Sequence, residues 1–327
     1  MIVSFINAVI GYFTVLIYGS TGELLTEKSG NLNLGTPGIM CVGGSFSVLC
    51  GYFLRDMAAK GTIRLNAFTA IFLTLLATLI GSLLVTLIYA FLTISLKANQ
   101  NVTGLAVTTF GTGLSNFIGA WVNSKAESGI MAFPEIADYY KVTLPFANKL
   151  GFFGDAFLAS GFMTYLSLVI VFVLAFVIRK TRTGLNLRSV GENPATADSA
   201  GINVTKYRYL ATCIGGMISG LGGLYFLMQY SDGGWNKNAI LPFGWLSVAI
   251  VIFVVWKPVL GIIGSATFGA LYALSNSITT IPPLTQQLFK LFPYIVTVLV
   301  LTISSMRKKR ELQPPESLGL PYFREER

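Results

Sequence analysis

The sequence contains no histidine among its 327 residues. Histidine is the only side chain whose ordinary pKa lies near neutral pH, and it is the commonest metal ligand. Its absence excludes histidine-ligated metal sites, histidine-based catalytic triads and histidine proton relays. No nucleophile–base pair or metal cluster remains that would indicate a membrane enzyme, so we expect neither catalytic residues nor a metal site.

Charged residues and cysteines are also scarce. Charged residues make up 11% of the chain, against roughly 25% in soluble domains. Hydrophobic residues reach 53%, and the mean hydropathy is +0.67. The three cysteines all lie in apolar runs and form no C-x-x-C pair, which is typical of buried hydrophobic side chains. The composition therefore excludes an ordinary soluble domain and indicates an integral membrane protein.

Long apolar runs divide the chain into membrane spans. A helix needs about 20 apolar residues to cross the hydrocarbon core, and open strands cannot satisfy their backbone groups there. No basic residue precedes Lys28, so we expect the first run to remain as a span rather than act as a cleaved signal peptide. The prediction is an all-α, polytopic transmembrane bundle of about nine spans: 2–21, 35–54, 67–94, 102–122, 158–178, 207–229, 241–256, 258–277 and 291–305.

The basic residues predict the orientation. Cytoplasmic loops carry an excess of lysine and arginine, and two clusters stand out, Arg179–Arg188 and the tail Arg307–Arg310. An even number of predicted spans separates them, so we expect both in the cytoplasm, with the N-terminus and the loop 123–157 outside. Arg55, Lys60 and Arg64 would then lie outside, against the trend.

The net charge of +9 fits contact with anionic lipid. It does not indicate nucleic acid, because no basic stripe is interleaved with exposed aromatic residues. We divide the chain into a transmembrane domain, 1–306, and a basic cytoplasmic tail, 307–327.

The sequence offers little that could drive transport by itself. Proton- or sodium-coupled carriers usually hold acidic residues or histidines at membrane depth, yet the third to ninth predicted spans contain no Asp or Glu. Only Glu23, Glu27 and Lys28 lie near a span, and no ATP-binding G-x-x-x-x-G-K-[ST] loop is present. Energy from another subunit is the favoured interpretation, and a self-sufficient secondary carrier is the alternative.

The loop 179–206 contains a short helix signal. Asn193 suits the N-cap, Pro194 the first helical position and Gly201 the C-terminal stop. We predict a helix over about 194–200, whose small residues give it a slim surface suited to a partner's groove. A solvated connecting helix is the alternative.

Small residues recur four positions apart in two spans, at Gly215, Ser219 and Gly223 and again at Gly261, Ser265 and Gly269. This spacing lets transmembrane helices approach closely. We favour helix packing over a role in lining a substrate path.

Several segments carry a family resemblance. The runs VGENPA at 190–195 and AGINV at 200–204 resemble the cytoplasmic coupling loop of ABC-importer permeases of the ribose and branched-chain amino acid superfamily. The runs at 22–35 (GELLTEKSGNLNLG) and 98–105, and the tail 313–327, are similar to its nucleoside-importer branch. The resemblance covers essentially the whole chain and implies a type II-like ABC importer permease.

The resemblance implies a multi-subunit machine in the cytoplasmic (plasma) membrane, with a multi-pass permease whose C-terminus is cytoplasmic. Two permease chains, usually non-identical, would form the pathway. Separate ATPase subunits would bind ATP and Mg, and an outer lipoprotein would deliver substrate. This chain would be a non-enzymatic transport subunit that binds no cofactor itself.

The resemblance also assigns residues. Contact with the ATPase would involve Arg188, Gly191, Glu192, Asn193, Pro194, Ala200 and Gly201. The loop 123–157, with Asp232 and Trp235, would face the binding lipoprotein. Arg188 could instead be a positive-inside anchor, and Trp235 an interfacial aromatic residue.

The segment 29–35 is the candidate substrate pathway. Gly30 and Gly35 permit irregular backbone, and Asn31 and Asn33 offer amide donors and acceptors for sugar hydroxyls or base edges. Glu23 borders this segment and joins the set. Irregular backbone at membrane depth is tolerated where it lines a cavity or is buried in protein, and a plain cytoplasmic turn is the alternative. We expect an importer of nucleosides and prefer purine nucleosides such as guanosine as the cargo. A simple sugar such as ribose is the alternative cargo.

Overall fold

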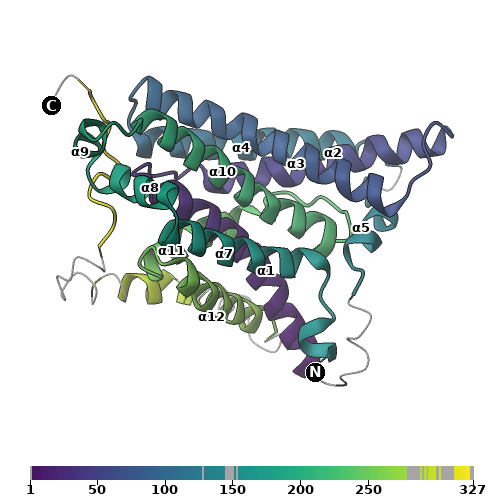
Figure 1. Ribbon diagram of the computed structural model, residues 1–327. Helices are drawn as coiled ribbons and strands as arrows, with labels where there is room; N and C mark the ends of the chain where they lie inside the picture. Colours follow the sequence, from purple (N-terminus) through teal and green to yellow (C-terminus); the bar gives the residue numbers. More distant parts are fainter. Residues whose placement is uncertain are drawn as a thin grey trace.

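The computed structural model describes residues 2–126, 129–143, 151, 154–277, 288, 291–292, 294–299, 302 and 313–324. Helices dominate this part of the chain, and it contains no strand, which confirms the all-α prediction. The elements in chain order (Figure 1) are α1 (Ile2–Glu27), α2 (Thr36–Ala59), α3 (Ala67–Ala90), η1 (Phe91–Ser95), α4 (Gln100–Asn123), α5 (Pro134–Tyr140), η3 (Gly154–Leu158), α7 (Phe162–Lys180), α8 (Arg182–Glu192), α9 (Pro194–Ser199), α10 (Val204–Leu224), η4 (Tyr225–Tyr230), α11 (Leu241–Phe253) and α12 (Pro258–Ser277).

Six described helices are long and apolar enough to cross a membrane: 2–27, 36–59, 67–95, 162–180, 204–230 and 258–276. Two further predicted spans, 102–122 and 241–256, correspond to α4 and to the 13-residue α11, which are not among the six. Most of the ninth predicted span, 291–305, lies outside the described residues. The structure thus confirms a multi-pass protein and does not confirm the count of nine.

Helix α3 shows how the fold suits a lipid environment. Thr74, Thr78, Ser82 and Thr86 repeat every four residues and are completely buried. On the opposite side, Leu76, Ile80 and Leu84 are 41–52% exposed. A soluble helix buries its apolar face, whereas in a bilayer the polar side chains seek partners inside the protein. The arrangement supports the assignment to the membrane independently of length.

The centre of the bundle is built from α1, α2 and α10. A Cβ atom at Gly22 would lie 2.2 Å from the carbonyl oxygen of Gly215, and one at Gly223 would lie 2.0 Å from that of Met40. These helices therefore meet backbone to backbone at the small residues of α10, as predicted. In α12 the pattern holds in part: Ser265 contacts Ser20 at 3.4 Å, while Gly261 faces open space.

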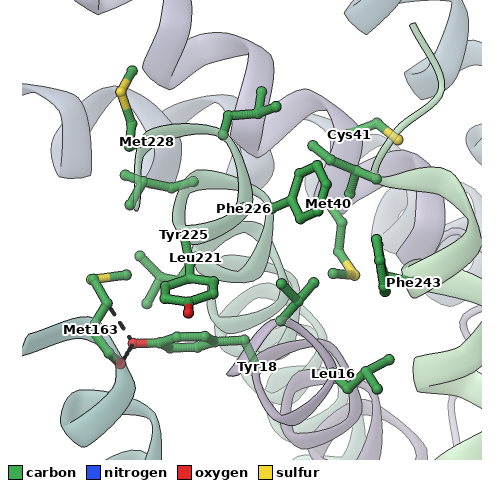
Figure 2. Packing of buried hydrophobic residues seen from close by; sticks show 14 of the residues in the cluster. Leu16, Tyr18, Met40, Cys41, Met163, Leu221, Tyr225, Phe226, Met228 and Phe243 are labelled. Carbon is green, nitrogen blue, oxygen red and sulfur yellow. Dashed lines mark hydrogen bonds between the residues drawn. The ribbon is translucent and has the colours of Figure 1, made fainter. Parts of the chain in front are cut away.

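Large side chains fill the space beside these close crossings. Figure 2 shows Leu16, Met40, Phe226 and Phe243 in one buried cluster. In the same cluster the Tyr18 hydroxyl donates a hydrogen bond to the carbonyl oxygen of Met163 at 2.7 Å. Burying an aromatic ring while its hydroxyl finds a partner is the usual way that tyrosine is accommodated inside a protein.

The helices run between two ends of the molecule. Helices α8 and α9 and the C-terminus lie at one end, and the N-terminus and α5 lie at the other (Figure 1). The basic loop 179–206 and the described tail residues 313–324 therefore share an end, as the sequence predicted. Arg55 donates a hydrogen bond to the carbonyl oxygen of Ala132 at 3.5 Å, just before α5. The loop with Arg55, Lys60 and Arg64, whose charge goes against the trend, therefore lies at the opposite end. Residues 307–310 lie outside the described residues.

Candidate functional site

Helix α1 continues past its predicted end at residue 21 to Glu27, and the chain then leaves the helix over residues 28–35, the α1–α2 break. Gly30 has a φ of +84°, which favours glycine. Gly35 has an ordinary φ of −81°, so the expectation of special backbone freedom there is wrong. Glycine fits at position 35 because a Cβ would lie 2.9 Å from Val107.

The break is a buried polar layer rather than an exposed turn. Ser29 and Asn31 are 0% exposed and Asn33 is 1% exposed. Side chains of two other helices, α3 and α4, hold its backbone. Gln100 of α4 accepts a hydrogen bond from the Leu32 N–H at 2.6 Å, the Tyr89 hydroxyl of α3 donates to the Leu32 carbonyl, and Thr108 of α4 donates to the Leu34 carbonyl at 2.6 Å. Irregular backbone buried in this way is the arrangement that a membrane permits.

Two buried carboxyl groups on the last turns of α1 face this layer. Glu23 accepts hydrogen bonds from the Asn33 backbone N–H at 3.1 Å and from the Thr36 hydroxyl. Glu27 accepts one from the Trp256 indole N–H. Buried carboxyl groups are tolerated only with such partners. The partners explain why α1 extends to Glu27, since they come from α2, the break and the turn before α12.

Four buried polar atoms around the break have no hydrogen-bond partner within the described part of the chain: Glu27 Oε1, Asn31 Oδ1, Asn33 Nδ2 and Arg208 Nε. The other end of the Asn31 amide donates to Thr212 at 3.1 Å. Buried polar groups are usually satisfied. Amide and carboxyl atoms with open hydrogen-bonding capacity could therefore bind a polar ligand at this position.

The Glu23 contacts lead to a stability prediction. Glu23→Leu removes the acceptor of two buried donors, so we expect the free energy of unfolding to fall by about 2–4 kcal/mol, since each buried unsatisfied group costs about 1–3 kcal/mol. Glu23→Gln keeps one acceptor oxygen and should lose less. Thermal melting of both variants in detergent, followed by tryptophan fluorescence, checks the order. Equal melting temperatures for the leucine and glutamine variants would show that the carboxyl contacts contribute nothing.

The helix predicted over about 194–200 is present as α9, Pro194–Ser199. The Asn193 side chain accepts a hydrogen bond from the Thr196 N–H at 2.9 Å, and Gly201 has a φ of +81°. Both observations match the predicted cap and stop. The structure adds α8, Arg182–Glu192, which the sequence analysis did not predict.

The residues expected to contact an ATPase are divided between surface and interior. Gly191 is buried, and a Cβ there would lie 2.3 Å from the carbonyl oxygen of Lys28. The end of α8 therefore packs directly on the first residue of the α1–α2 break. Pro194 is partly buried, and the remaining members of the set are exposed: Arg188, Glu192, Asn193, Ala200 and Gly201. The structure thus brings the predicted coupling and pathway segments into contact.

The two residues expected to face a binding protein differ in exposure. Asp232 is exposed and forms an ion pair with Lys141. Trp235 is 7% exposed, and its ring packs against Gly119 of α4. The Trp235 side chain is therefore largely buried in this structure, and its expected contact with a lipoprotein, like the interfacial alternative, stays a prediction.

Sequence reasoning missed Gln100, Tyr89, Trp256 and Arg208 as members of this site. Arg208 carried a signal that could have identified it. It is a charged residue inside a predicted span, and such residues usually face the protein interior with a partner. The other three gave no local signal, because their hydrogen bonds to the break or to the end of α1 join positions far apart in the chain.

Comparison with known proteins places the chain among transport permeases. The description "branched-chain amino acid transport system / permease component" matches residues 5–301. A Haloferax volcanii protein named as a glucose ABC transporter permease, TsgC13, is 33% identical over 98% of this chain and 97% of its own length. The guanosine ABC transporter permease NupQ of Bacillus subtilis is 30% identical over 98% of this chain and 97% of its own length.

A third relative, the nucleoside ABC transporter permease NupC of Lactococcus lactis, is 30% identical over 89% of each chain. Together with the membrane-spanning helices, these matches confirm the resemblance noted in the coupling-loop and N-terminal motifs. The chain belongs to the family of permease components of branched-chain amino acid transport systems.

Proposed function

We propose that this chain is the permease subunit of an ATP-driven ABC importer for nucleosides, and that it forms half of the translocation pathway. The family membership supports the permease role. Two relatives, from Bacillus subtilis and Lactococcus lactis, are named for guanosine and nucleoside transport and support the cargo. Guanosine is our first choice because the guanosine permease aligns over nearly the whole chain.

The observation that carries the cargo assignment within the molecule is the buried layer around the break. Asn31 and Asn33 each have one open amide atom there, an acceptor on Asn31 and a donor on Asn33. A nucleoside presents both donors and acceptors on its base edge and its ribose hydroxyls, which match this pair. We assign Gly30, Asn31, Asn33, Gly35 and Glu23 to the substrate pathway.

The family membership supports the remaining parts of the proposal, which are the orientation and the partner subunits. The α8–α9 end is the cytoplasmic end, so the C-terminus is cytoplasmic. In this proposal Arg188, Glu192, Asn193, Pro194, Ala200 and Gly201 form the contact with an ATPase subunit that carries ATP and Mg, and the buried Gly191 supports them by packing on Lys28. A second, non-identical permease chain completes the pathway. A substrate-binding lipoprotein approaches the α5 end near Asp232, and the membrane domain includes the region of the ninth predicted span.

A simple sugar is the second candidate cargo, because the Haloferax volcanii relative named for glucose is 33% identical over nearly the whole chain. The two cargoes share hydroxyl groups, so the amides of Asn31 and Asn33 do not by themselves separate them. A nucleoside differs in carrying a base with ring nitrogens that accept hydrogen bonds.

Competition of uptake distinguishes the two cargoes. Cells that express the complete transporter take up labelled guanosine while unlabelled guanosine, ribose or glucose is added in excess. We expect unlabelled guanosine to suppress the signal and both sugars to leave it unchanged. If labelled glucose or ribose enters instead and guanosine does not compete, the nucleoside assignment is wrong and the sugar importer takes its place.

A further inference from the structure

The last described segment, residues 313–324, folds back across the α8–α9 end, and we call it the C-terminal strap. It passes from α8 to α9 along the surface beside the break (Figure 1). It contains no helix, so its position depends on contacts with the elements that it crosses. Those contacts fall into two groups.

The outer group joins the strap to α9. The Tyr322 hydroxyl donates a hydrogen bond to the carboxylate of Asp198 on α9 at 2.9 Å, and Arg324 pairs with the same carboxylate at 3.2 Å. The Tyr322 ring packs against a small cluster made by Val190, Ala197 and Val204. The side of α9 that turns toward the protein is thus held by the strap.

The inner group joins the strap to the end of α8 and to the break. The Ser317 hydroxyl and backbone N–H both donate to the Gly191 carbonyl, at 2.6 and 3.1 Å. Two residues further on, the Gly319 N–H donates to the Gly30 carbonyl at 3.3 Å. One short stretch of strap therefore bonds to both segments that meet at the contact between Gly191 and Lys28.

Two side chains from other helices fasten the strap at this point. Arg208 is 2% exposed and donates to the Ser317 hydroxyl at 3.4 Å and to the Leu320 carbonyl at 3.3 Å. The Gln100 amide donates to Leu320 at 3.4 Å, while its oxygen accepts from Leu32 of the break. A buried arginine is costly in a membrane protein, and here its guanidinium is directed to the strap.

We propose that the C-terminal strap is a mechanical link between α9 and the α1–α2 break, and that Ser317 and Tyr322 are its positioning residues. The strap holds α9 at one end and the backbone of the break at the other, so a displacement of α9 pulls on Gly30 and its neighbours. This role rests on the proposed function, in which α9 contacts the ATPase and the break belongs to the substrate pathway.

The test uses the complete transporter reconstituted in liposomes and measures substrate taken up per ATP hydrolysed. Tyr322→Phe removes the tyrosine hydrogen bond of the outer group, and Ser317→Ala removes the hydroxyl bond of the inner group. Each should lower the ratio by roughly fivefold, within the range expected for losing one hydrogen bond, while ATP hydrolysis continues. The double variant should fall no further than the single ones, because either cut interrupts the same link.

Matched controls carry the same chemical changes elsewhere. Tyr165→Phe removes a hydroxyl that bonds to Phe157, and Ser275→Ala removes one that bonds within α12. Both should keep the wild-type ratio of substrate taken up to ATP hydrolysed. Ser317→Thr keeps the hydroxyl and should therefore show a ratio close to that of the wild type, unlike Ser317→Ala. The proposal is overturned by an unchanged ratio in both strap variants. It is also overturned if the two losses multiply in the double variant and track a loss of assembled complex, as a purely structural role requires.

The cargo assignment is separable from this result. The ratio is measured with the cargo that the wild-type complex carries. A wild-type complex that carries a sugar and no nucleoside would refute the proposed nucleoside function and leave the strap comparison intact.

Discussion

Glu192→Arg is expected to lower nucleoside uptake by at least about thirtyfold while the protein remains in the membrane at its normal level, since disrupting a paired interfacial charge costs about 2–5 kcal/mol. Glu192 is exposed and ends α8, directly before the cap of α9. In the proposed function the change reverses the charge of the surface that faces the ATPase, and the membrane level of the protein reports any effect on folding. Uptake of labelled guanosine and the amount of tagged protein in membranes are measured together.

The control for this prediction is Glu135→Arg, which reverses an exposed charge on α5 at the opposite end of the molecule. Glu135→Arg should leave ATPase docking unchanged. Glu192→Gln should give an uptake rate between those of the wild type and Glu192→Arg. Pull-down of the ATPase with each variant locates the defect. Unimpaired uptake by Glu192→Arg would remove residue 192 from the coupling contact.

The largest effect on stability is expected from Gly223→Val. A Cβ at this position would lie 2.0 Å from the Met40 carbonyl oxygen and 2.8 Å from the Gly44 backbone nitrogen. Both atoms belong to the backbone of α2, so no side chain can rotate away. Forcing extra atoms into a packed core typically costs 1–3 kcal/mol and occasionally more, and a backbone clash belongs at the upper end. We expect the free energy of unfolding to fall by about 3 kcal/mol or more, and we expect little monodisperse protein after solubilisation.

Gly261→Val is the matched control, because it makes the same change in the other small-residue span. A Cβ at Gly261 has nothing within 4 Å. Gel filtration and thermal melting in detergent should therefore show a normal protein for Gly261→Val and an aggregated one for Gly223→Val. Similar profiles for the two variants would mean that the close approach of α2 and α10 does not limit stability.

The sequence predicted those features that depend on local chemistry. The apolar runs predicted the long helices because a span must be apolar over its whole length. Asn193, Pro194 and Gly201 predicted α9, since caps and stops act within a single turn. The four-residue spacing of Gly215, Ser219 and Gly223 predicted the close crossings of α10 for the same reason.

The features that the sequence did not predict depend on residues distant in the chain. Helix α1 extends to Glu27 because Thr36 and Trp256 provide hydrogen-bond partners, and neither lies within the helix. The sequence did not predict that the Trp235 ring packs against the small Gly119 of α4. The strap depends on Ser317 meeting Gly191 across 126 positions of sequence. No local pattern records such pairings.

For the candidate site, the sequence selected the segment 29–35 but gave no information on the elements that surround it. The Asn33 backbone N–H donates a hydrogen bond to Glu23, and Asn31 lies in the same buried layer, where its amide donates to Thr212. The sequence left open a plain cytoplasmic turn or irregular backbone that lines a cavity or is buried in protein. The structure shows a buried layer, which the Gly191 backbone ties to the α8–α9 end. Contact between the pathway and coupling segments followed from neither motif alone.

The most direct test of the central claim is to purify the tagged chain from its native host in mild detergent and identify the co-purifying proteins by mass spectrometry. The account predicts a P-loop ATPase, a second permease chain and a substrate-binding lipoprotein whose isolated form binds nucleosides. Recovery of the chain alone, in a state that still transports in liposomes under an ion gradient without ATP, would contradict it and would identify Glu23 and Glu27 as candidates for ion coupling.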